Sequence, residues 1–469
     1  MKDSIANMMK VERGAGVMAL EREEGKEQPY IPAGIFKIRL PFIHYRWEIS
    51  ECLQAILMCA TCLGAIPVLM DVLGVPYEVA WSMVIINGFF YCLHALLGDP
   101  VVPGWITPAL PLVTAFLTLS EQGPERIQTM IALQLVVGII FLFMGLTGLA
   151  SKIIGAIPNT IKAGILVGAG LSAIMGEFKD GGRVGLYPVT VLIGSVIAYF
   201  LLFSILFKRM KAGNKLWYLV GNFGMLPAII VAIIVGPLSG ELETPPLVLG
   251  SIIKIPEFGT ILRTISPFAV GFPGVDKFLA TIPTAIAVYI ISFGDFVSSE
   301  QLISNAAERR TDEKIDFNAN RSNIISALRN LIQAVICPYP NLCGPLWAAV
   351  TAAIAERYKD GRKAMDSIYS GVGTFRWSTF ICVALVPVAS FVQPILPAAL
   401  SLTLIVQGYV CCQIGLKMVR TDTERGLAGV MAAVLAIKGA TWGLAVGVVL
   451  YILINGNFRN PVALPEAEA

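Results

Sequence analysis

Apolar runs of membrane-spanning length recur along this chain from about residue 50 to residue 457. A helix needs about 20 mostly apolar residues to cross a bilayer. The chain has 469 residues, of which 56% are hydrophobic and 14% are charged, whereas a soluble domain has roughly 25% charged residues. The runs are too many, and the polar surface is too small, for a large soluble enzyme. The sequence therefore predicts an all-α polytopic membrane protein.

We place about 14 transmembrane segments in the chain, seven in each half. The first half has runs near 50–72, 75–97, 104–120, 127–149, 157–176, 185–207 and 217–238. The second half has runs near 278–299, 319–338, 344–356, 375–393, 396–417, 424–440 and 442–457. The predicted domains are a cytoplasmic tail with an interfacial segment (1–48), a first repeat (49–240), an extracytoplasmic connection (241–277), a second repeat (278–457) and a cytoplasmic tail (458–469). We expect the first 30 residues, which are charged and poorly hydrophobic, to be disordered.

Proline and glycine interrupt the two halves at matching places. The stretches 103–108 and 340–345 each hold two prolines five residues apart, and they begin 237 positions apart. Ile157-Pro158 and Leu396-Pro397 repeat the pattern, with their prolines 239 positions apart. Paired, Gly/Pro-broken segments in two halves are typical of transporters with the substrate site at the breaks. The pattern predicts a duplicated unit with broken segments 3 and 10; the alternative is that these prolines only kink two packed helices.

Loop charges predict the orientation of the chain in the membrane. Basic residues follow segments six, eight, ten and twelve, and few occupy the odd-numbered loops. The positive-inside rule then places both termini in the cytoplasm of a multi-pass cell-membrane protein. An odd number of spans in each half inserts the second half upside down, so the predicted layout is a 7+7 inverted repeat.

Several functional classes find no support in the composition. The net charge is +3, without a basic block suited to nucleic acid. The nine cysteines fall almost entirely in apolar segments, without a zinc or disulfide pattern. No nucleophile–base pair or metal cluster is evident, so we expect neither an enzyme nor a resident cofactor. Na⁺ or H⁺ remains a possible coupling ion. We expect His94, near the end of segment two, to be interfacial.

The order and spacing of several motifs resemble the nucleobase–ascorbate transporter family, which contains the xanthine and uracil permeases. The motifs are Leu53-Gln-Ala-Ile-Leu, Ile66-Pro-Val-Leu, Pro103 to Pro111, Ile157-Pro158 through Gly170, Ile282-Pro283 through Ile303, and Pro340-Asn341 followed by Gly344. The resemblance covers about residues 50–457. It implies a core domain (segments 1–4 and 8–11), a gate domain (5–7 and 12–14), elevator-like movement and a homodimer through the gate. Sulfate permeases and bicarbonate transporters share that fold.

The chain departs from the family where the base would bind. Family members use a glutamate in segment eight, where this chain has Ile291 or Ser292, and another at the start of segment ten, where it has Gly344, Pro345 and Leu346. The substrate therefore stays open between a nucleobase-like heterocycle, moved by ion-coupled symport, and a small inorganic or organic anion. A passive channel is a third reading, which broken helices and a single buried acid fit less well.

The breaks themselves predict a site between two half-helix N-termini. Thr107-Pro108 and Gly344-Pro345 each have the pattern of an N-cap followed by the first helical residue. The free N–H donors and positive dipole end of each helix suit an anion or a carbonyl-rich molecule. The resemblance places Gln54 near the substrate. Trp105 could stack on a planar substrate, Asn341 could contact substrate or pin the extended chain, and Leu346 occupies a family binding position.

Segment eight supplies a second wall. Ser292, Asp295 and Ser299 fall within about a 60° arc of a helix. Asp295 is the only acid well inside the apolar stretch 282–297, and an acid there is a functional candidate by default. It could carry a proton, bind sodium together with Ser299, contact the substrate, or be a capped structural acid. Without a nearby Lys or Arg, we expect an anion to require that Asp295 be protonated or sodium-bound.

Overall fold

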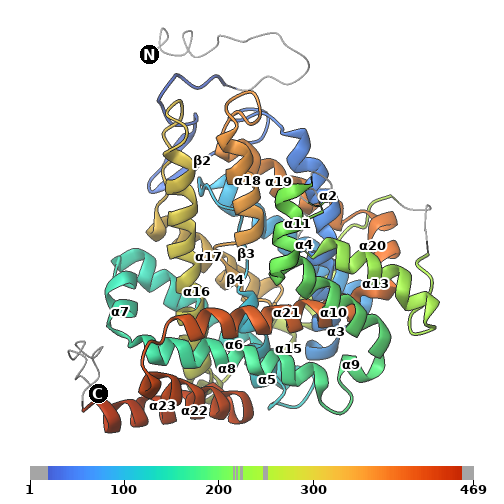
Figure 1. Cartoon of the computed structure of the whole chain (residues 1–469), viewed down its shortest axis with the longest axis vertical. Helices are drawn as coiled ribbons and strands as arrows, with labels where there is room; N and C mark the ends of the chain where they lie inside the picture. The colour runs from blue at the N-terminus through green and yellow to red at the C-terminus, as the bar shows by residue number, and fades with distance from the viewer. Residues whose placement is uncertain (1–19, 215–216, 218–219, 222–224, 247–251, 457–469) are drawn as a thin grey trace.

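The computed structural model describes residues 20–214, 217, 220–221, 225–246 and 252–456. The chain is mostly helical, at 72%, which confirms the predicted all-α character (Figure 1). The long helices of the first half are α2 (Ile49–Leu63), α3 (Ala65–Leu73), α4 (Tyr77–Leu96), α6 (Pro124–Thr147), α8 (Asn159–Phe178), α10 (Pro188–Phe203), α11 (Ile205–Gly213) and α13 (Leu226–Leu238). Those of the second half are α16 (Val275–Ala307), α17 (Ala319–Ile336), α18 (Ala348–Lys359), α19 (Ile368–Val383), α21 (Leu396–Lys417), α22 (Asp422–Lys438) and α23 (Ala440–Asn455).

Five helical stretches of the described residues are long and apolar enough to cross a membrane, or seven if two bent pairs each count as one span. The five are 77–96, 124–147, 159–186, 275–307 and 386–417. One bent pair joins α2 to α3 at 42°, and the other joins α10 to α11 at 62°. Shorter apolar helices cover 107–117, 227–238, 258–270 and 440–455. Helices therefore occur within the predicted ranges in the described residues, while much of 217–224 at the start of the seventh predicted segment lies outside them. The 14-segment, 7+7 layout stays a prediction.

Several boundaries differ from those predicted. α19 begins at Ile368, seven residues before the predicted 375, because Ser367 and Ser370 form a capping box at its start. Because this first turn is partly polar, the apolar run that predicted the segment begins only after it. α16 runs well past the predicted 278–299 at both ends. The predicted connection 241–277 contains two short helices, α14 (Phe258–Thr264) and α15 (Pro267–Val270), in its described part.

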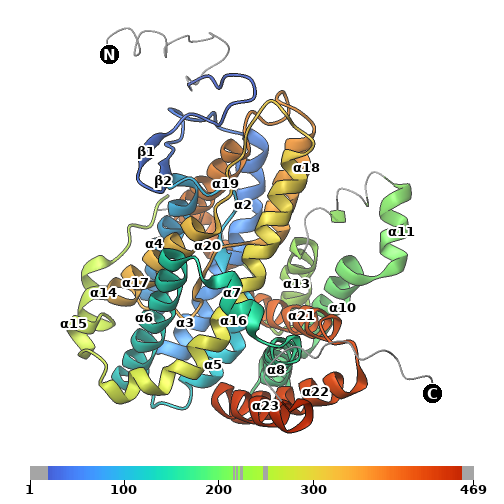
Figure 2. The ribbon, with the colours of Figure 1, turned by 90° about the vertical axis from the view of Figure 1, so that its left-hand side faces the viewer.

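The helices pack in two groups, which lie side by side in Figure 2. The first group, which we call the core group, consists of α2, α3, α4, α6, α16, α17, α18 and α19. The second, the gate group, consists of α8, α10, α13, α21, α22 and α23. This is the division that the family resemblance implies for core and gate domains. The contacts between the groups involve α8 and α21, which pack near the first break.

Glycines allow the gate helices to approach closely. A Cβ atom on Gly164 would lie 2.5 Å from Sδ of Met431 on α22, and one on Gly170 would lie 2.6 Å from the backbone oxygen of Gly408 on α21. Both distances are shorter than real Cβ contacts; Met431 would have to move to admit a Cβ at Gly164, whereas the backbone oxygen facing Gly170 requires glycine there. Close contact through small residues is typical of helix packing in membranes.

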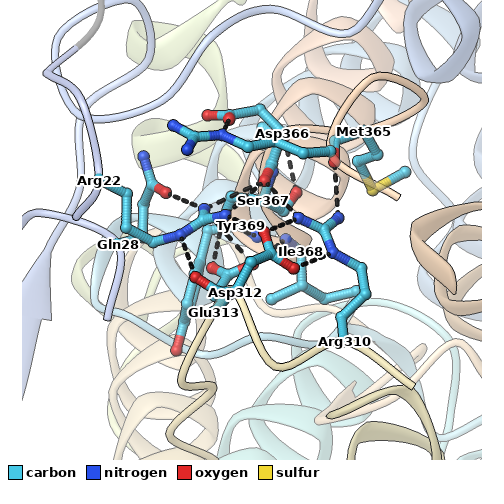
Figure 3. A network of polar contacts seen from close by, with 12 residues as sticks. Arg22, Gln28, Arg310, Asp312, Glu313, Met365, Asp366, Ser367, Ile368 and Tyr369 are labelled. Carbon is cyan, nitrogen blue, oxygen red and sulfur yellow. Dashed lines mark hydrogen bonds and ion pairs between the residues drawn. The ribbon is translucent and has the colours of Figure 1, made fainter. Parts of the chain in front are cut away.

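The chain before the first long helix is ordered from residue 20, which corrects the expected disorder of residues 20–30. Residues 20–46, here called the N-terminal clasp, contain the hairpin β1 (Ile31–Ala33) and β2 (Phe36–Ile38). Arg22 and Arg39 are buried despite their charge. Arg22 donates to Oδ2 of Asp312 at 2.7 Å and to the Asp366 carbonyl at 3.0 Å (Figure 3). The clasp thus joins the loops that precede α17 and α19.

The clasp network satisfies its buried charges. Arg310 donates to Oδ1 of Asp312 at 2.7 Å, and this contact with Arg310, aided by Arg22, lowers the pKa of Asp312 to about 2. Glu313 accepts hydrogen bonds from the Ser367 hydroxyl at 2.5 Å and from the Ile368 amide at 3.2 Å. Burial raises the pKa of Glu313. All of these partners belong to loops of the core group, so the clasp binds that group.

Candidate functional site

The two proline-containing breaks meet in space. β3 (Gly104–Trp105) and β4 (Cys343–Gly344) pair antiparallel, with glycine opposite glycine. The pairing continues where the Ile106 amide donates to the Leu342 carbonyl at 2.9 Å. Two segments more than 200 residues apart in sequence therefore cross at one point inside the core group (Figure 1).

The crossing requires both glycines. A Cβ atom on Gly104 would lie 2.9 Å from the Leu346 carbonyl oxygen, which is backbone and cannot move independently. A Cβ on Gly344 would lie 2.9 Å from Cγ1 and 3.1 Å from the amide nitrogen of Ile106. Glycine is the usual solution where one backbone approaches another this closely.

The helix start after the first break differs from the prediction. The 3₁₀ helix η1 (Thr107–Ala109) leads into α5 (Leu110–Leu117), and Ile106 occupies the N-cap position. The Thr107 hydroxyl does not cap a backbone amide; its partner is the Trp105 carbonyl, at 3.5 Å. The predicted capping role of Thr107 is therefore wrong, because the 3₁₀ turn already includes this residue.

The helix start after the second break also lies later than predicted. Gly344 belongs to β4, and α18 begins at Ala348 with Trp347 at the N-cap. The Trp347 amide donates to the Val102 carbonyl at 2.6 Å. Strand pairing therefore holds the chain extended up to Trp347 and delays the helix, which makes the predicted N-cap at Gly344 wrong.

A cavity of about 510 Å³ opens at the start of α18. Its lining residues are Ser298, Gln301 and Leu302 of α16 and Ala348, Ala349 and Ala352 of α18. No side chain caps the first turn of α18, and the residues of α18 that line the cavity are all alanines. Such a helix start binds anions through its free N–H groups and its dipole. Residues of η1 are not among the lining residues.

Asp295 lies one turn from the cavity lining on α16. It shares a helical face with Ser298 and Leu302, at spacings of three and seven residues. The side chain is half-buried, and no hydrogen bond or ion pair to its carboxylate is found within the described part of the chain. Cys411 of α21 is close enough for the charge of Asp295 to act on it. The acid therefore lies where the core group meets the gate group.

The two predicted serines of α16 are buried and point along the helix. Ser292 donates to the Tyr289 carbonyl at 3.0 Å, and Ser299 donates to the Asp295 carbonyl at 2.7 Å. Both hydroxyl protons are used within the helix, as is common for serine in apolar helices. Each oxygen keeps its lone pairs, so Ser299 remains able to accept a hydrogen bond or to bind a cation beside Asp295.

Two buried arginines flank the crossing and were missed by the sequence reasoning. Arg329 of α17 is fully buried and donates to the Gly344 carbonyl at 3.0 Å and to the Gly104 carbonyl at 3.4 Å. Arg376 of α19 is 1% exposed. Its guanidinium carbon lies 5.2 Å from the centre of the Trp347 ring, beside the start of α18. Neither arginine forms an ion pair or hydrogen bond with Asp295 among the described residues, so the expectation that Asp295 has no basic residue nearby stays a prediction.

The signal for these arginines was present in the sequence. Arg376 is the single charge of α19, and Arg329 lies in the middle of α17, whose other charge is Arg321 in the first turn. A charge in the middle of a membrane segment is the argument that selected Asp295. Applied to basic residues, it would have selected Arg329 and Arg376 as well.

The remaining predicted residues surround the crossing less directly. Asn341 and Leu346 are buried in the second break, and both polar atoms of the Asn341 side chain lack a protein partner. Trp105 is half-buried in β3. Gln54 is half-buried on α2 and precedes Ala55, which packs in the same apolar cluster as Leu346.

His94 corrects another expectation. It is fully buried rather than interfacial, and its Nδ1 lies 2.8 Å from Oδ2 of Asp99. The same carboxylate oxygen accepts a hydrogen bond from Ser322 at 2.6 Å. This buried cluster joins the end of α4 to the start of α17, on the cytoplasmic side of the predicted topology.

Comparison with solved structures finds this fold among anion transporters. The transmembrane domain of the cyanobacterial bicarbonate transporter BicA matches with a TM-score of 0.51 and 12% identity, over 85% of this chain and 97% of that one. The murine anion transporter Slc26a9 in its inward-facing state matches with a TM-score of 0.53 and 13% identity, over 87% of this chain and 68% of that one. A further SLC26A9 structure matches with a TM-score of 0.51 and 14% identity, over 87% of this chain and 66% of that one.

At these identities the likeness establishes the fold of a membrane-transporter transmembrane domain. No protein-family model matches the chain, and no curated protein matches it in sequence. The assignment to the nucleobase–ascorbate family is thus not confirmed. The similar structures are instead of the kind that the resemblance named as sharing its fold.

Proposed function

We propose that this protein is a secondary transporter of a small inorganic or organic anion, bound at the start of α18. The observation that carries the proposal is the uncapped, alanine-lined first turn of α18, which opens into the cavity beside α16. A helix N-terminus supplies free N–H donors and about half a positive charge. The names of the similar structures, a bicarbonate transporter and anion transporters, agree with this reading.

The buried charges favour an anion over a nucleobase. Arg329 adds a positive charge next to the crossing, and it forms no ion pair with a carboxylate among the described residues. The positions of the family glutamates hold Ile291 or Ser292, the latter bonded to its own helix, and the break residues Gly344 to Leu346. A planar base therefore lacks its usual carboxylate partners, whereas an anion meets a positive field.

Asp295 provides the coupling in this proposal. A half-buried carboxylate without a protein partner, one turn from the cavity, suits a proton or a sodium ion, with Ser299 as a second oxygen ligand. Binding the cation would offset the charge of Asp295 and allow an anion to enter nearby. Movement of the core group against the gate group, as an elevator, would then carry both ions. The inverted repeat, the homodimer through the gate and cytoplasmic termini belong to the same proposal.

Uptake into proteoliposomes tests the substrate class. The purified full chain would be reconstituted and supplied with labelled bicarbonate, sulfate, halide and short carboxylates, and separately with uracil and xanthine. Each would be tested with and without sodium and at two pH values. We expect saturable uptake of at least one anion and none of the bases. Saturable uptake of a base alone would overturn the proposal.

A matched pair of variants tests the position of the site. Ala349 lines the cavity on the first turn of α18 and is exposed to it. Ala349→Asp places a negative charge at the anion-binding helix start, whereas Ala349→Asn has nearly the same size without charge. We expect Ala349→Asp to reduce anion uptake at least tenfold relative to Ala349→Asn, since like charges about 4 Å apart near a protein surface repel by about 4 kcal/mol, and about 1.4 kcal/mol gives a tenfold change. Equal uptake by the two variants would place the anion elsewhere.

A further inference from the structure

Arg376 is a buried cation whose donors have no acceptor. It lies in the middle of α19, is 1% exposed, and its Nε, Nη1 and Nη2 atoms all lack a hydrogen-bond partner among the described residues. Its neighbours are aromatic: the guanidinium carbon lies 4.4 Å from the centre of the Tyr91 ring and 5.5 Å from that of Phe375. A cation–π contact contributes about 2 kcal/mol when desolvated, whereas an unpaired buried ion costs several kcal/mol. The rings alone therefore do not hold this charge.

The nearby groups supply donors and another cation, not an anion. Arg329 lies on the same tyrosine, with its guanidinium carbon 4.7 Å from the Tyr91 ring centre, and its Nε atom is also unpartnered. Cys62 lies close enough to Arg376 for the two groups to act on each other electrostatically, and a neutral thiol is a weak acceptor. Asp99 accepts from His94 and Ser322 through Oδ2, and its buried Oδ1 forms no hydrogen bond or ion pair with either arginine among the described residues.

A second unpartnered donor belongs to the same region. The Tyr339 hydroxyl is fully buried and has no partner among the described residues. Tyr339 interacts electrostatically with Tyr91 and Cys62, the same two residues that interact with Arg376. Arg376 and Tyr339 thus share Tyr91 and Cys62 as neighbours, and buried donors of this kind are almost always satisfied.

We propose that a halide-sized monovalent anion is held at Arg376, with Tyr339 as a second donor, in a site separate from the transport site. One negative charge would neutralise the unpaired guanidinium and accept its hydrogen bonds. An apolar surrounding favours a weakly hydrated monovalent anion over a divalent oxyanion, because the divalent ion loses more hydration free energy on burial. Because Arg376 is enclosed, whereas the transport cavity is open at Ala348 and Ala349, this anion is a structural component. It fixes α19 against α4 and α17.

Anomalous diffraction with bromide tests the site directly. Crystals of the full chain grown in sodium bromide should show an anomalous peak within hydrogen-bond distance of the Arg376 guanidinium. A peak only at the start of α18 would overturn this proposal while supporting the proposed transport function. A guanidinium bonded only to waters, or to a Cys62 thiolate, would also overturn it. The two proposals therefore fail separately.

Thermal stability provides a second readout that needs no crystals. At equal ionic strength, chloride or bromide should raise the melting temperature of the wild type above its value in gluconate, because an anion bound to the folded state stabilises it by mass action. Arg376→Gln should lose this halide-specific rise. The matched control Arg425→Gln changes an arginine whose side chain is 58% exposed and should keep it. If Arg376→Gln does not fold, the absence of any halide-specific rise in the wild type would by itself overturn the proposal.

Discussion

Asp295 is a half-buried acid on α16 whose carboxylate has no hydrogen bond or ion pair among the described residues. Most acids in the described residues lie in loops or at helix ends, and many of them form ion pairs there. Desolvating a carboxylate without a partner is expensive in a membrane, and such residues mark ion pathways. Asp295 lies beside both the cavity lining and Cys411, so this unfavourable desolvation occurs where the two helix groups meet.

Replacing Asp295 by asparagine should uncouple transport. Asn keeps the shape of the side chain but carries neither a negative charge nor a titrating proton, so Asp295→Asn should abolish concentrative uptake while leaving exchange of internal for external anion. The measurement is uphill uptake and counterflow in the same proteoliposomes. The control is Asp276→Asn, an exposed acid in the first turn of the same helix. Undiminished concentrative uptake by Asp295→Asn would refute the coupling role.

Single residues of the site were predictable where the argument was local. A charge inside an apolar run identifies Asp295, and the same test would have identified Arg329 and Arg376. The start of α18 was not predictable in this way, because it depends on the bond from the Trp347 amide to Val102, 245 residues earlier. No local pattern around Gly344 reports that partner.

At the scale of elements, the apolar runs of the sequence predicted where the helices lie. Polar contacts set several helix boundaries that these runs did not predict. The N-terminal clasp shows most clearly where prediction from the local sequence fails. Its composition is typical of disorder, yet Arg22 bonds to Asp312 across 290 positions. A charged segment of low hydrophobicity folds here because its partners are buried charges in distant loops, which the sequence of the segment itself does not reveal.

The clasp should release in acid. The folded-state pKa of Asp312, lowered to about 2 by Arg310 and Arg22, lies below its ordinary value of 3.8. Its stabilising contribution is therefore present above about pH 4 and is lost as the pH falls toward 2. Glu313 has the opposite effect on how stability changes with pH, because burial raises its pKa and folding therefore favours its protonated form. Release should consequently follow Asp312 and occur below about pH 4.

Hydrogen–deuterium exchange measures this release through the protection factors of peptides from residues 20–46 and 308–318. Protection should hold from neutral pH to about pH 4 and fall below it. Asp312→Asn should already lose protection at neutral pH, whereas the exposed-acid control Asp422→Asn, whose side chain is 97% exposed, should match the wild type. Release of the wild-type clasp near neutral pH would contradict the assignment to Asp312.

At the scale of the whole molecule, the two helix groups meet mainly through apolar contacts, with one cross-group ion pair among the described residues. Arg183, just before α10, donates to Oδ2 of Asp71 on α3 at 2.6 Å and to Oε1 of Glu177 at 2.8 Å. Asp71 belongs to the core group and Glu177 to the gate group. An interface that has to slide benefits from few fixed polar contacts, and this pair stabilises the one arrangement that the structure describes.

Asp71→Asn should shift the conformational equilibrium away from this arrangement while leaving the Arg183–Glu177 pair within the gate group intact. The side chain of Asp71 is 60% exposed, and an exposed ion pair contributes about 1 kcal/mol or less, so the ratio of conformations should change by no more than about fivefold. The readout is the rate at which a thiol reagent labels Ser298→Cys in the cavity, above the background of the native cysteines.

Glu78→Gln is the matched control for this shift. It breaks a pair with Lys254 that is equally exposed, with the Glu78 side chain at 56%, but that does not join the two groups. If the Asp71–Arg183 pair holds the core group against the gate group, both Asp71→Asn and Arg183→Gln will slow labelling at Ser298→Cys. High salt will slow it in the same way, because it screens the pair. Glu78→Gln will leave the labelling rate unchanged. Equal labelling of all four proteins would mean that the pair is broken in solution or that the two groups do not move against each other.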